Sequence, residues 1–332
     1  MMKTYNRTMK KILMLLSLVG FAISANAGDV VTVTISDGVE DPSVKAKMER
    51  QISTLFTEAN AAHEAQRAMN YASLGVSDEV QTSLAMLWDN SPFVCLDTEI
   101  VERCLSTSSG YQVRNLPLQL VEAEEGDDYQ EAVVNFDAQG NMTSFRLAIS
   151  TNLYMNVIKS NIELVDLRRR QLILDYVEQF RTAYNQKDSE FLEAIFSDDA
   201  LIITGKVITR KTRDGVKLPD KIEYTKHTKR DYLGRLKTIF SKNKQIRVTF
   251  DEIEVMLHPI DADVYGVTLH QGYTADNYHD DGYLFLLWDF KDETHPQIHV
   301  RTWQPDAYDK NGTGSKQRIP KSEIFSLSDF DI

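Results

Sequence analysis

The sequence predicts an α+β protein of two domains, in which helices pack against curved antiparallel sheets. Each half of the chain opens with apolar residues at helical spacing and continues with strand-like segments. Short turns separate these strands, as is typical of antiparallel hairpins. After an amino-terminal export segment, about 300 residues remain, which is the usual length for two domains.

The first residues have the three-part pattern of a secretory signal peptide. Four basic residues at positions 3–11 precede an apolar run at 12–23, and Ala25-Asn26-Ala27 has the small-x-small form of a cleavage site. The apolar run is too short to span a bilayer as a mature helix. We therefore expect cleavage after about Ala27 and a periplasmic or secreted protein without a membrane span.

Composition excludes several classes of site. The formal charge of −12 becomes −16 without the signal peptide, which argues against a nucleic-acid partner. Cys95 and Cys104 are too few for a structural zinc site, and the sequence leaves open whether they form a disulfide. A nucleophile elbow, a phosphate-binding glycine loop and a His-x-x-x-His helix are all absent, so we expect no cofactor and no metal.

The predicted amino-terminal domain covers residues 28–160. A short strand near 30–35 precedes a helix at 43–66, whose apolar residues from Met48 to Ala59 share one face. Ser77 and Asp78 begin a second helix. The expected strands are 112–121, 132–136 and 142–149, with a hairpin turn at 137–141.

The predicted carboxy-terminal domain covers residues 161–304, with an extension at 305–332. Its first helix, at 166–186, carries one apolar stripe, and Asp188 caps a short second helix. A strand from Leu201 leads into a long hairpin, and Thr228 with Asp231 resembles a capping box that opens a third helix. Four more strands are expected at 246–257, 264–273, 283–290 and 297–303.

Three consecutive segments of this domain resemble the opening of nuclear transport factor 2-like domains. They are Tyr176–Asp188, Phe191–Phe196 and Ser197–Ile203. The superfamily includes ketosteroid isomerases and SnoaL-like polyketide cyclases with a cystatin-like α+β cone. The resemblance covers about 166–304 and implies a curved antiparallel sheet wrapped by helices. The motif is loose and identifies a fold rather than an activity.

One sequence pattern occurs in both halves of the chain. In both halves a strand ends in Phe, a polar turn follows, and the returning strand carries an Arg: Phe136 with Arg146, and Phe290 with Arg301. One interpretation is a diverged second copy of the same fold in residues 40–155. The alternative is that antiparallel hairpins share such patterns generally.

The resemblance also implies where isomerase relatives carry their catalytic groups. The position matching the tyrosine of the first helix is Phe180, and the position matching the catalytic aspartate is Thr204. Phe cannot donate a hydrogen bond to an oxyanion, and Thr is not a base near neutral pH. The isomerase constellation is therefore absent, which favours a protein that is not an enzyme.

Other side chains are candidates for lining the cone. His299, Arg301 and Trp303 alternate along the last strand, where Arg would bind an anion and Trp would stack on a ring. The alternative is that this face meets solvent, with Ile298 and Val300 directed to the core. The complete candidate pocket is Phe180, Tyr184, His270, Trp288, His299, Arg301 and Trp303.

Two charged segments remain. Asp276, His279, Asp280 and Asp281 cluster between two strands, where the sequence favours a tight turn over a metal site. Residues 206–244 contain thirteen Lys or Arg and four Asp or Glu in an otherwise acidic chain. This basic segment is either a solvated hairpin or an arm that docks on an acidic region, a partner or an acidic glycan.

These observations leave two hypotheses about function. The first is an exported, non-catalytic module that binds a small molecule, glycan or protein, with a homodimer through the sheet as one arrangement. The second is a small-molecule isomerase, cyclase or hydrolase that uses His270, His299 or Arg301. Convergence of two of these three side chains with a carboxylate in one cavity would favour the enzyme.

Overall fold

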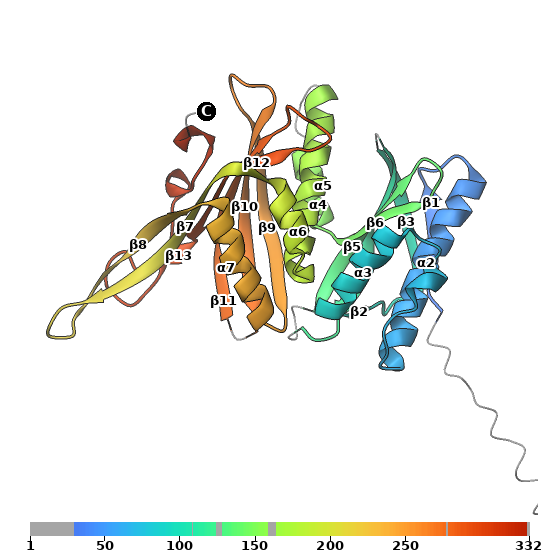
Figure 1. The fold of residues 1–332 in the computed structure, drawn as a ribbon, viewed down its shortest axis with the longest axis horizontal. Helices are drawn as coiled ribbons and strands as arrows, with labels where there is room; N and C mark the ends of the chain where they lie inside the picture. The colour runs from blue at the N-terminus through green and yellow to red at the C-terminus, as the bar shows by residue number, and fades with distance from the viewer. Residues whose placement is uncertain (1–29, 108, 124–127, 159–163, 277, 331–332) are drawn as a thin grey trace, which may run out of the picture.

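The computed structural model describes residues 30–330 apart from positions 108, 124–127, 159–163 and 277 (Figure 1). The predicted signal peptide lies outside the described residues. The chain forms two α+β domains, each with its own sheet and its own apolar core, as predicted. Within the described part of the chain, no helix is long and apolar enough to cross a membrane.

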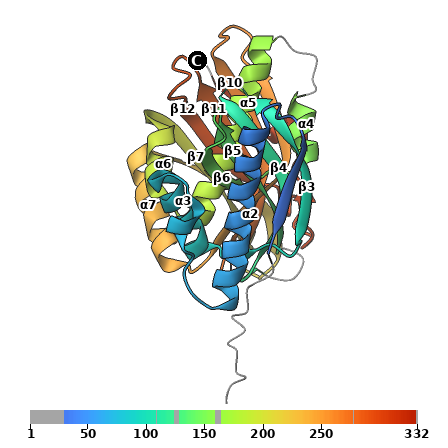
Figure 2. The same cartoon turned by 90° about the vertical axis from the view of Figure 1, so that its right-hand side faces the viewer.

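The amino-terminal domain packs two helices against one sheet, and Figure 2 shows both helices lying over that sheet. Asp41 caps the first helix and Ser77 caps the second through side-chain oxygens that accept backbone N–H bonds. The residues of the first helix that were predicted to share one apolar face are buried, and so are Val80, Leu84, Leu87 and Trp88 of the second. The elements are β1 Thr32–Asp37, α2 Pro42–Glu64, η1 Tyr71–Leu74, α3 Asp78–Asn90, β2 Phe93–Val94, β3 Glu99–Thr107, β4 Gly110–Leu120, β5 Tyr129–Asp137 and β6 Met142–Leu147.

The order of elements in this domain differs from that of the second domain. Its sheet runs β1-β3-β4-β5-β6, with β2 paired to β4, and β1 lies parallel to β3 at the edge. Here a strand precedes the helix pair, and among the residues that the structure describes no third helix interrupts the strands that follow. The shared features are thus a helix pair and an antiparallel meander, without the connectivity that a second copy would repeat.

The carboxy-terminal domain has the predicted succession of helices, hairpin, helix and four strands. Asp188 caps α6 and Thr228 caps α7, as expected from the sequence. Its elements are α4 Thr151–Ile158, α5 Leu164–Gln186, α6 Ser189–Ile195, β7 Phe196–Lys211, β8 Lys217–His227, α7 Lys229–Lys242, β9 Ile246–Leu257, β10 Val264–Ala275, β11 Tyr278–Asp289, β12 Gln297–Pro305, β13 Ala307–Tyr308, β14 Gln317–Arg318, η2 Lys321–Glu323 and η3 Leu327–Asp329.

The large sheet of this domain runs β8-β7-β12-β11-β10-β9. Its neighbours are antiparallel except β12 and β7, which are parallel because the last long strand returns beside the first. Helices α5, α6 and α7 pack on one face and share its apolar core. This arrangement confirms the nuclear transport factor 2-like α+β fold that the resemblance predicts.

The opposite face of the sheet is covered in part by the end of the chain. Leu327, Phe325 and Phe330 join Phe285 and Leu287 in a separate apolar cluster. The rings of Phe285 and Phe330 are stacked with centroids 5.5 Å apart. A homodimer through the sheet remains a prediction, and the extension occupies part of the face that it would use.

Helix α5 belongs to both domains. It packs against β9 on one side and against α3 and β6 on the other. The short helix α4 also packs on β9, and its Tyr154 and Val157 are buried in the carboxy-terminal core. The division between the domains therefore falls near Ser150 rather than at the predicted position 160.

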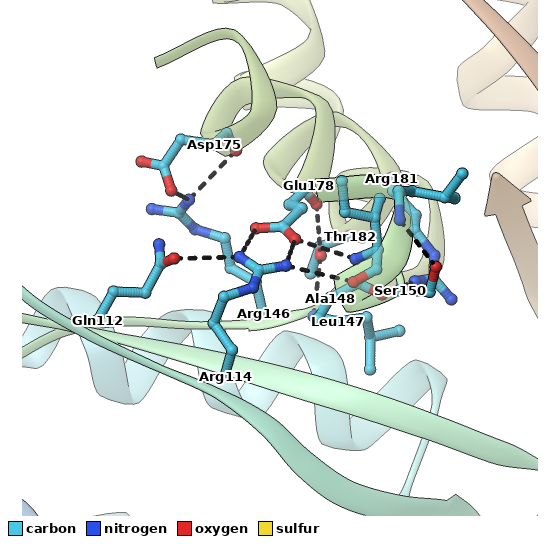
Figure 3. A network of polar contacts seen from close by, with 12 residues as sticks. Gln112, Arg114, Arg146, Leu147, Ala148, Ser150, Asp175, Glu178, Arg181 and Thr182 are labelled. Atoms are coloured by element: carbon cyan, nitrogen blue, oxygen red, sulfur yellow. Dashed lines mark hydrogen bonds and ion pairs between the residues drawn. The ribbon is translucent and has the colours of Figure 1, made fainter. Parts of the chain in front are cut away.

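The side of α5 that faces the amino-terminal domain is polar and buried (Figure 3). Glu178 is fully buried and forms an ion pair with Arg114 of β4, with Arg114 Nη1 3.2 Å from Glu178 Oε2. Glu178 Oε1 also accepts the backbone N–H of Ile149 at 3.0 Å. The guanidinium of Arg114 lies 4.1 Å from the ring centroid of Tyr154. This buried pair fixes the amino-terminal sheet to the helix.

Arg181, one turn further along α5, bonds to three segments. It donates to the backbone oxygens of Val248, at 2.8 Å, and of Ala148, and to the side chain of Gln130. Complete burial lowers the pKa of Arg181 to about 10, so it stays charged at neutral pH. Arg181 thereby links β9 to the connection between the domains.

Cys95 and Cys104 are free thiols in the structure, and both are buried. Burial raises the pKa of each thiol to about 11. Both groups are therefore protonated at neutral pH and only weakly nucleophilic.

Removing one partner of the buried interdomain ion pair should lower the stability of the protein. We expect Arg114→Met to lower the free energy of unfolding by about 3–5 kcal/mol, because Glu178 would remain buried without its counter-ion. Urea unfolding followed by circular dichroism measures this change. The double variant Arg114→Met/Glu178→Leu should recover part of the loss.

The matched control is Lys237→Met, which breaks the exposed pair between Lys237 Nζ and Glu193 Oε2 at 3.1 Å. Exposed pairs contribute no more than about 1 kcal/mol. A loss for Arg114→Met as small as that of the control would show that the buried pair does not hold the domains together.

Candidate functional site

A pocket of about 650 Å³ lies in the carboxy-terminal domain between α7 and one end of the sheet. Strands β7, β10, β11 and β12 contribute to its wall, and so does Tyr184 from α5. Phe180, Phe196 and Trp288 are fully buried between the helices and the sheet. The wall of the pocket itself contains both polar and apolar side chains.

Arg301 is the central charged group of this pocket. It sits on β12, an interior strand of the sheet, opposite Ile202 of β7 and Leu286 of β11. Its neighbours Val300 and Thr302 alternate to the other face, so the pleat directs Arg301 toward the helices. Arg301 is 5% exposed, and its guanidinium carbon lies 4.8 Å from the ring centroid of Tyr232.

The guanidinium of Arg301 is incompletely paired. Its Nε and Nη1 atoms are buried without a hydrogen-bond partner among the described residues, and no described carboxylate forms an ion pair with it. Its hydrogen-bonding neighbour is the hydroxyl of Tyr184, a neutral group. Because Arg stays protonated in proteins, a full positive charge is buried at this position without a matching anion.

Tyrosines surround this charge. The hydroxyls of Tyr184 and Tyr232 are hydrogen-bonded to each other. Burial raises the pKa of Tyr184 well above its usual value and that of Tyr273 to about 12, so both are neutral donors. The Tyr273 hydroxyl is buried and has no partner within the described chain. Arg301 and Tyr273 therefore offer the pocket donors that the protein leaves unused.

The acidic residues of the pocket wall, by contrast, have partners. Asp280 accepts a hydrogen bond from Tyr278 at 2.6 Å, and Asp281 Oδ2 lies 3.0 Å from His279 Nε2. Asp306 lies 3.9 Å from Arg318 on the outside of the sheet. The basic wall residues Lys206 and Arg235 make no ion pair with any described residue. The pocket wall thus holds four cations, Lys206, Arg235, Arg301 and Lys316, and three carboxylates, which gives it a formal charge of +1.

His227 is a pocket residue that the sequence analysis missed. Its Nε2 lies 2.8 Å from the hydroxyl of Thr204, because β8 pairs with β7 next to this position. Burial, followed by the charges of Arg235 and Arg301, lowers the pKa of His227. The signal was available in the sequence only as a histidine directly before the cap of α7.

Three of the seven candidate residues line the pocket, namely Tyr184, Arg301 and Trp303. Trp303 lies against Gly282 of β11, where an added Cβ would come within 2.7 Å of the indole ring. The approach of that ring thus requires glycine. Phe180 and Trp288 are fully buried core residues that pack beneath the pocket.

The two histidines among the candidates are elsewhere. His270 points to the opposite face of the sheet, where its Nδ1 lies 2.6 Å from Asp251 and its Nε2 3.5 Å from Asp306. The position is a consequence of the pleat, since its neighbours Leu269 and Gln271 face the helices. His299 lies near Asp199 and Asp289, outside the pocket. His270, His299 and Arg301 do not converge, so an enzyme built on these three side chains is not supported.

The acidic cluster at 276–281 is divided between a turn and a strand. Asp276 has a positive φ of 47° and accepts the backbone N–H groups of Lys244 and Gln245 at 3.0 Å. Asp281, expected in a tight turn, is instead paired within β11, which extends further than predicted. Among the described residues, no group of three or more His, Cys, Asp or Glu could hold a metal ion.

Similar proteins are found among solved structures, at low sequence identity. No family model and no curated protein matches the sequence. Solved structures that match include a nuclear transport factor 2-like protein from Cytophaga hutchinsonii, 18% identical over 41% of this chain and 98% of that one, with a TM-score of 0.32. Another is a domain of unknown function with a cystatin-like fold from Nostoc punctiforme, 17% identical over 41% of this chain and 75% of that one, with a TM-score of 0.29.

The lowered pKa of His227 leads to a prediction about the titration of its imidazole ring. The imidazole should titrate below the usual value of about 6.5, and Arg235→Gln should raise its pKa because one repelling charge is removed. NMR titration of the histidine ring resonances measures both values. Since the unfolded chain binds the proton first as pH falls, this group lowers the free energy of unfolding below about pH 6.5.

The control for this titration is Arg230→Gln, an exposed position on the same helix that does not line the pocket. It should leave the pKa of His227 unchanged. Equal shifts in the two variants would mean that His227 responds to the general charge of α7 rather than to the pocket.

Proposed function

We propose that the carboxy-terminal domain binds a small ligand through an anionic group, with Arg301 as its counter-ion, and that it acts as a binding module. The observation that carries this proposal is the buried guanidinium without a carboxylate partner. Burying an unpaired charge costs several kcal/mol. The contact with Tyr232 offsets part of that cost, since cation–π pairs contribute about 0.5–2 kcal/mol.

A ligand carboxylate is the group that fits this arrangement best. The planar guanidinium matches a carboxylate in a forked geometry, and such charge-assisted bonds are among the stronger ones in proteins. The free hydroxyl of Tyr273 would supply a further donor. Trp303, Tyr232 and Tyr273 add ring surfaces to the wall, which favours a ligand with a flat or ring-shaped body.

The same wall favours binding over proton-transfer chemistry. A general base needs a free lone pair that faces the substrate. Nε2 of His227 lies at the hydroxyl of Thr204, and the Tyr184 hydroxyl is bonded to that of Tyr232, so neither of these two atoms is a free base. Phe180, at the position that carries a tyrosine in isomerase relatives, is buried beneath the pocket. These contacts support a role in holding a ligand.

Replacing Arg301 should abolish binding of small carboxylates. We expect glucuronate and benzoate to raise the melting temperature of the protein, and glucose and benzyl alcohol to leave it unchanged. Arg301→Gln should weaken carboxylate affinity at least about tenfold, because a hydrogen bond to a charged group contributes about 1.5–3 kcal/mol. Isothermal titration calorimetry gives the affinities.

Arg318→Gln is the matched control, since Arg318 is exposed and lies against Tyr283 on the opposite face of the sheet. It should bind carboxylates like the unaltered protein. Lys206→Gln, at the pocket wall, provides a second test if Arg301→Gln fails to fold. Carboxylate binding that survives both pocket substitutions would refute the proposed site.

We also propose that the protein acts outside the cytoplasm. The support is the signal-peptide pattern of residues 1–27. Amino-terminal sequencing of the protein recovered from cell fractions should find Gly28 as the first residue in a periplasmic or secreted fraction. Recovery of a chain that retains residues 1–27 in the cytoplasm would contradict this localisation.

A further inference from the structure

The long hairpin of β7 and β8 projects from the body of the carboxy-terminal domain (Figure 1). Strand β8 is the edge of the sheet, and the tip of the hairpin is exposed from Thr209 to Val216. The hairpin begins at the pocket, since Thr204 and Lys206 of β7 and His227 of β8 belong to its wall. One continuous surface therefore runs from the pocket onto the hairpin.

Cations follow this surface at strand spacing. Lys206, Ile208 and Arg210 alternate along β7, and the register places Glu223 of β8 opposite Lys206 and Lys221 opposite Ile208, with a register shift before Arg210. Lys206 and Arg210 are thus about 13 Å apart along the strand, at about 3.3 Å per residue. Because Lys206 lines the pocket, this is the face of the hairpin that continues the pocket wall.

These cations outnumber the acidic residues on their face of the hairpin, where Glu223 lies opposite Lys206 in the register. Lys206, Arg210 and Lys221 are exposed, and none makes an ion pair with a described residue. The neighbouring Lys217, in contrast, is paired with Asp309 at 2.7 Å. In a chain with a formal charge of −12, such a local excess of positive charge is complementary to an acidic partner.

We infer that the ligand is an acidic oligosaccharide, with one uronate unit in the pocket on Arg301 and the following units along the Lys206, Lys221 and Arg210 face of the hairpin. This inference rests on the proposed function. Three features support a glycan: repeated cations match repeated carboxylates, the pocket adds aromatic ring surfaces, and the single buried guanidinium fits one terminal acidic group.

The test uses oligogalacturonates of one, two, four and six units with the purified full chain, measured by calorimetry at 50 and 300 mM NaCl. Affinity should increase at least tenfold from the monomer to the hexamer and should fall with salt for the longer ligands. The double variant Lys221→Gln/Arg210→Gln should reduce hexamer affinity to that of the monomer while leaving monomer affinity unchanged. Lys242→Gln, an exposed cation at the far end of α7, is the control and should have no effect.

The outcomes separate the two proposals. A hexamer that binds no more tightly than a monomer, with Arg301 still required, would overturn the inference and leave the proposed function in place. No binding of any carboxylate would overturn both. Hexaglutamate that binds as tightly as hexagalacturonate through the same hairpin residues would show that the partner is an acidic peptide rather than a glycan.

Discussion

Helix α5 must pack against both domains at once, and the rest of the structure depends on this constraint. One side of the helix covers the large sheet with Val177, Phe180 and Tyr184, and the other places Glu178 and Arg181 in the interface with the first domain. A buried charge is tolerated only when its hydrogen bonds and its counter-ion are in place. Arg114 and the backbone around Ile149 provide these for Glu178, so the position of the helix is specified from both directions.

The same helix relates the interface to the pocket. Arg181 and Asn185 both bond to the backbone of Val248 in β9, while Tyr184, between them in the sequence, faces Tyr232 and Arg301. A shift of α5 would therefore move a pocket tyrosine together with the interface. The amino-terminal domain thus contributes to the geometry of the ligand site without lining it.

Helices, caps and hairpins could be predicted from the sequence because their signals are local. Asp188 and Thr228 cap helices wherever the chain places them, and the apolar stripe of α5 identifies its core face. The polar side of α5 could not be interpreted in this way, since Glu178 and Arg181 look solvated until a second domain covers them. Strand alternation placed Arg301 among the candidate pocket residues, and in the structure it lies on the face of β12 toward the helices.

Strand alternation also determines where the histidines lie. His270 lies next to a shift in register between β10 and β9, and only the assembled sheet shows which face it occupies. His227 reaches the pocket through the pairing of β8 with β7, a contact between residues that are separated by the whole hairpin. Both positions depend on tertiary placement rather than on the identity of the strands.

The carboxy-terminal extension has a consequence for how the protein can be handled and altered. An added Cβ at Gly266 would come within 2.7 Å of Leu327, so the tail lies directly on the sheet backbone there. This short segment covers the apolar side chains of Phe285, Leu287 and Val300. Shortening the chain before Leu327, or fusing a bulky tag close behind it, would expose an apolar strip of the sheet. The protein would then be prone to aggregation.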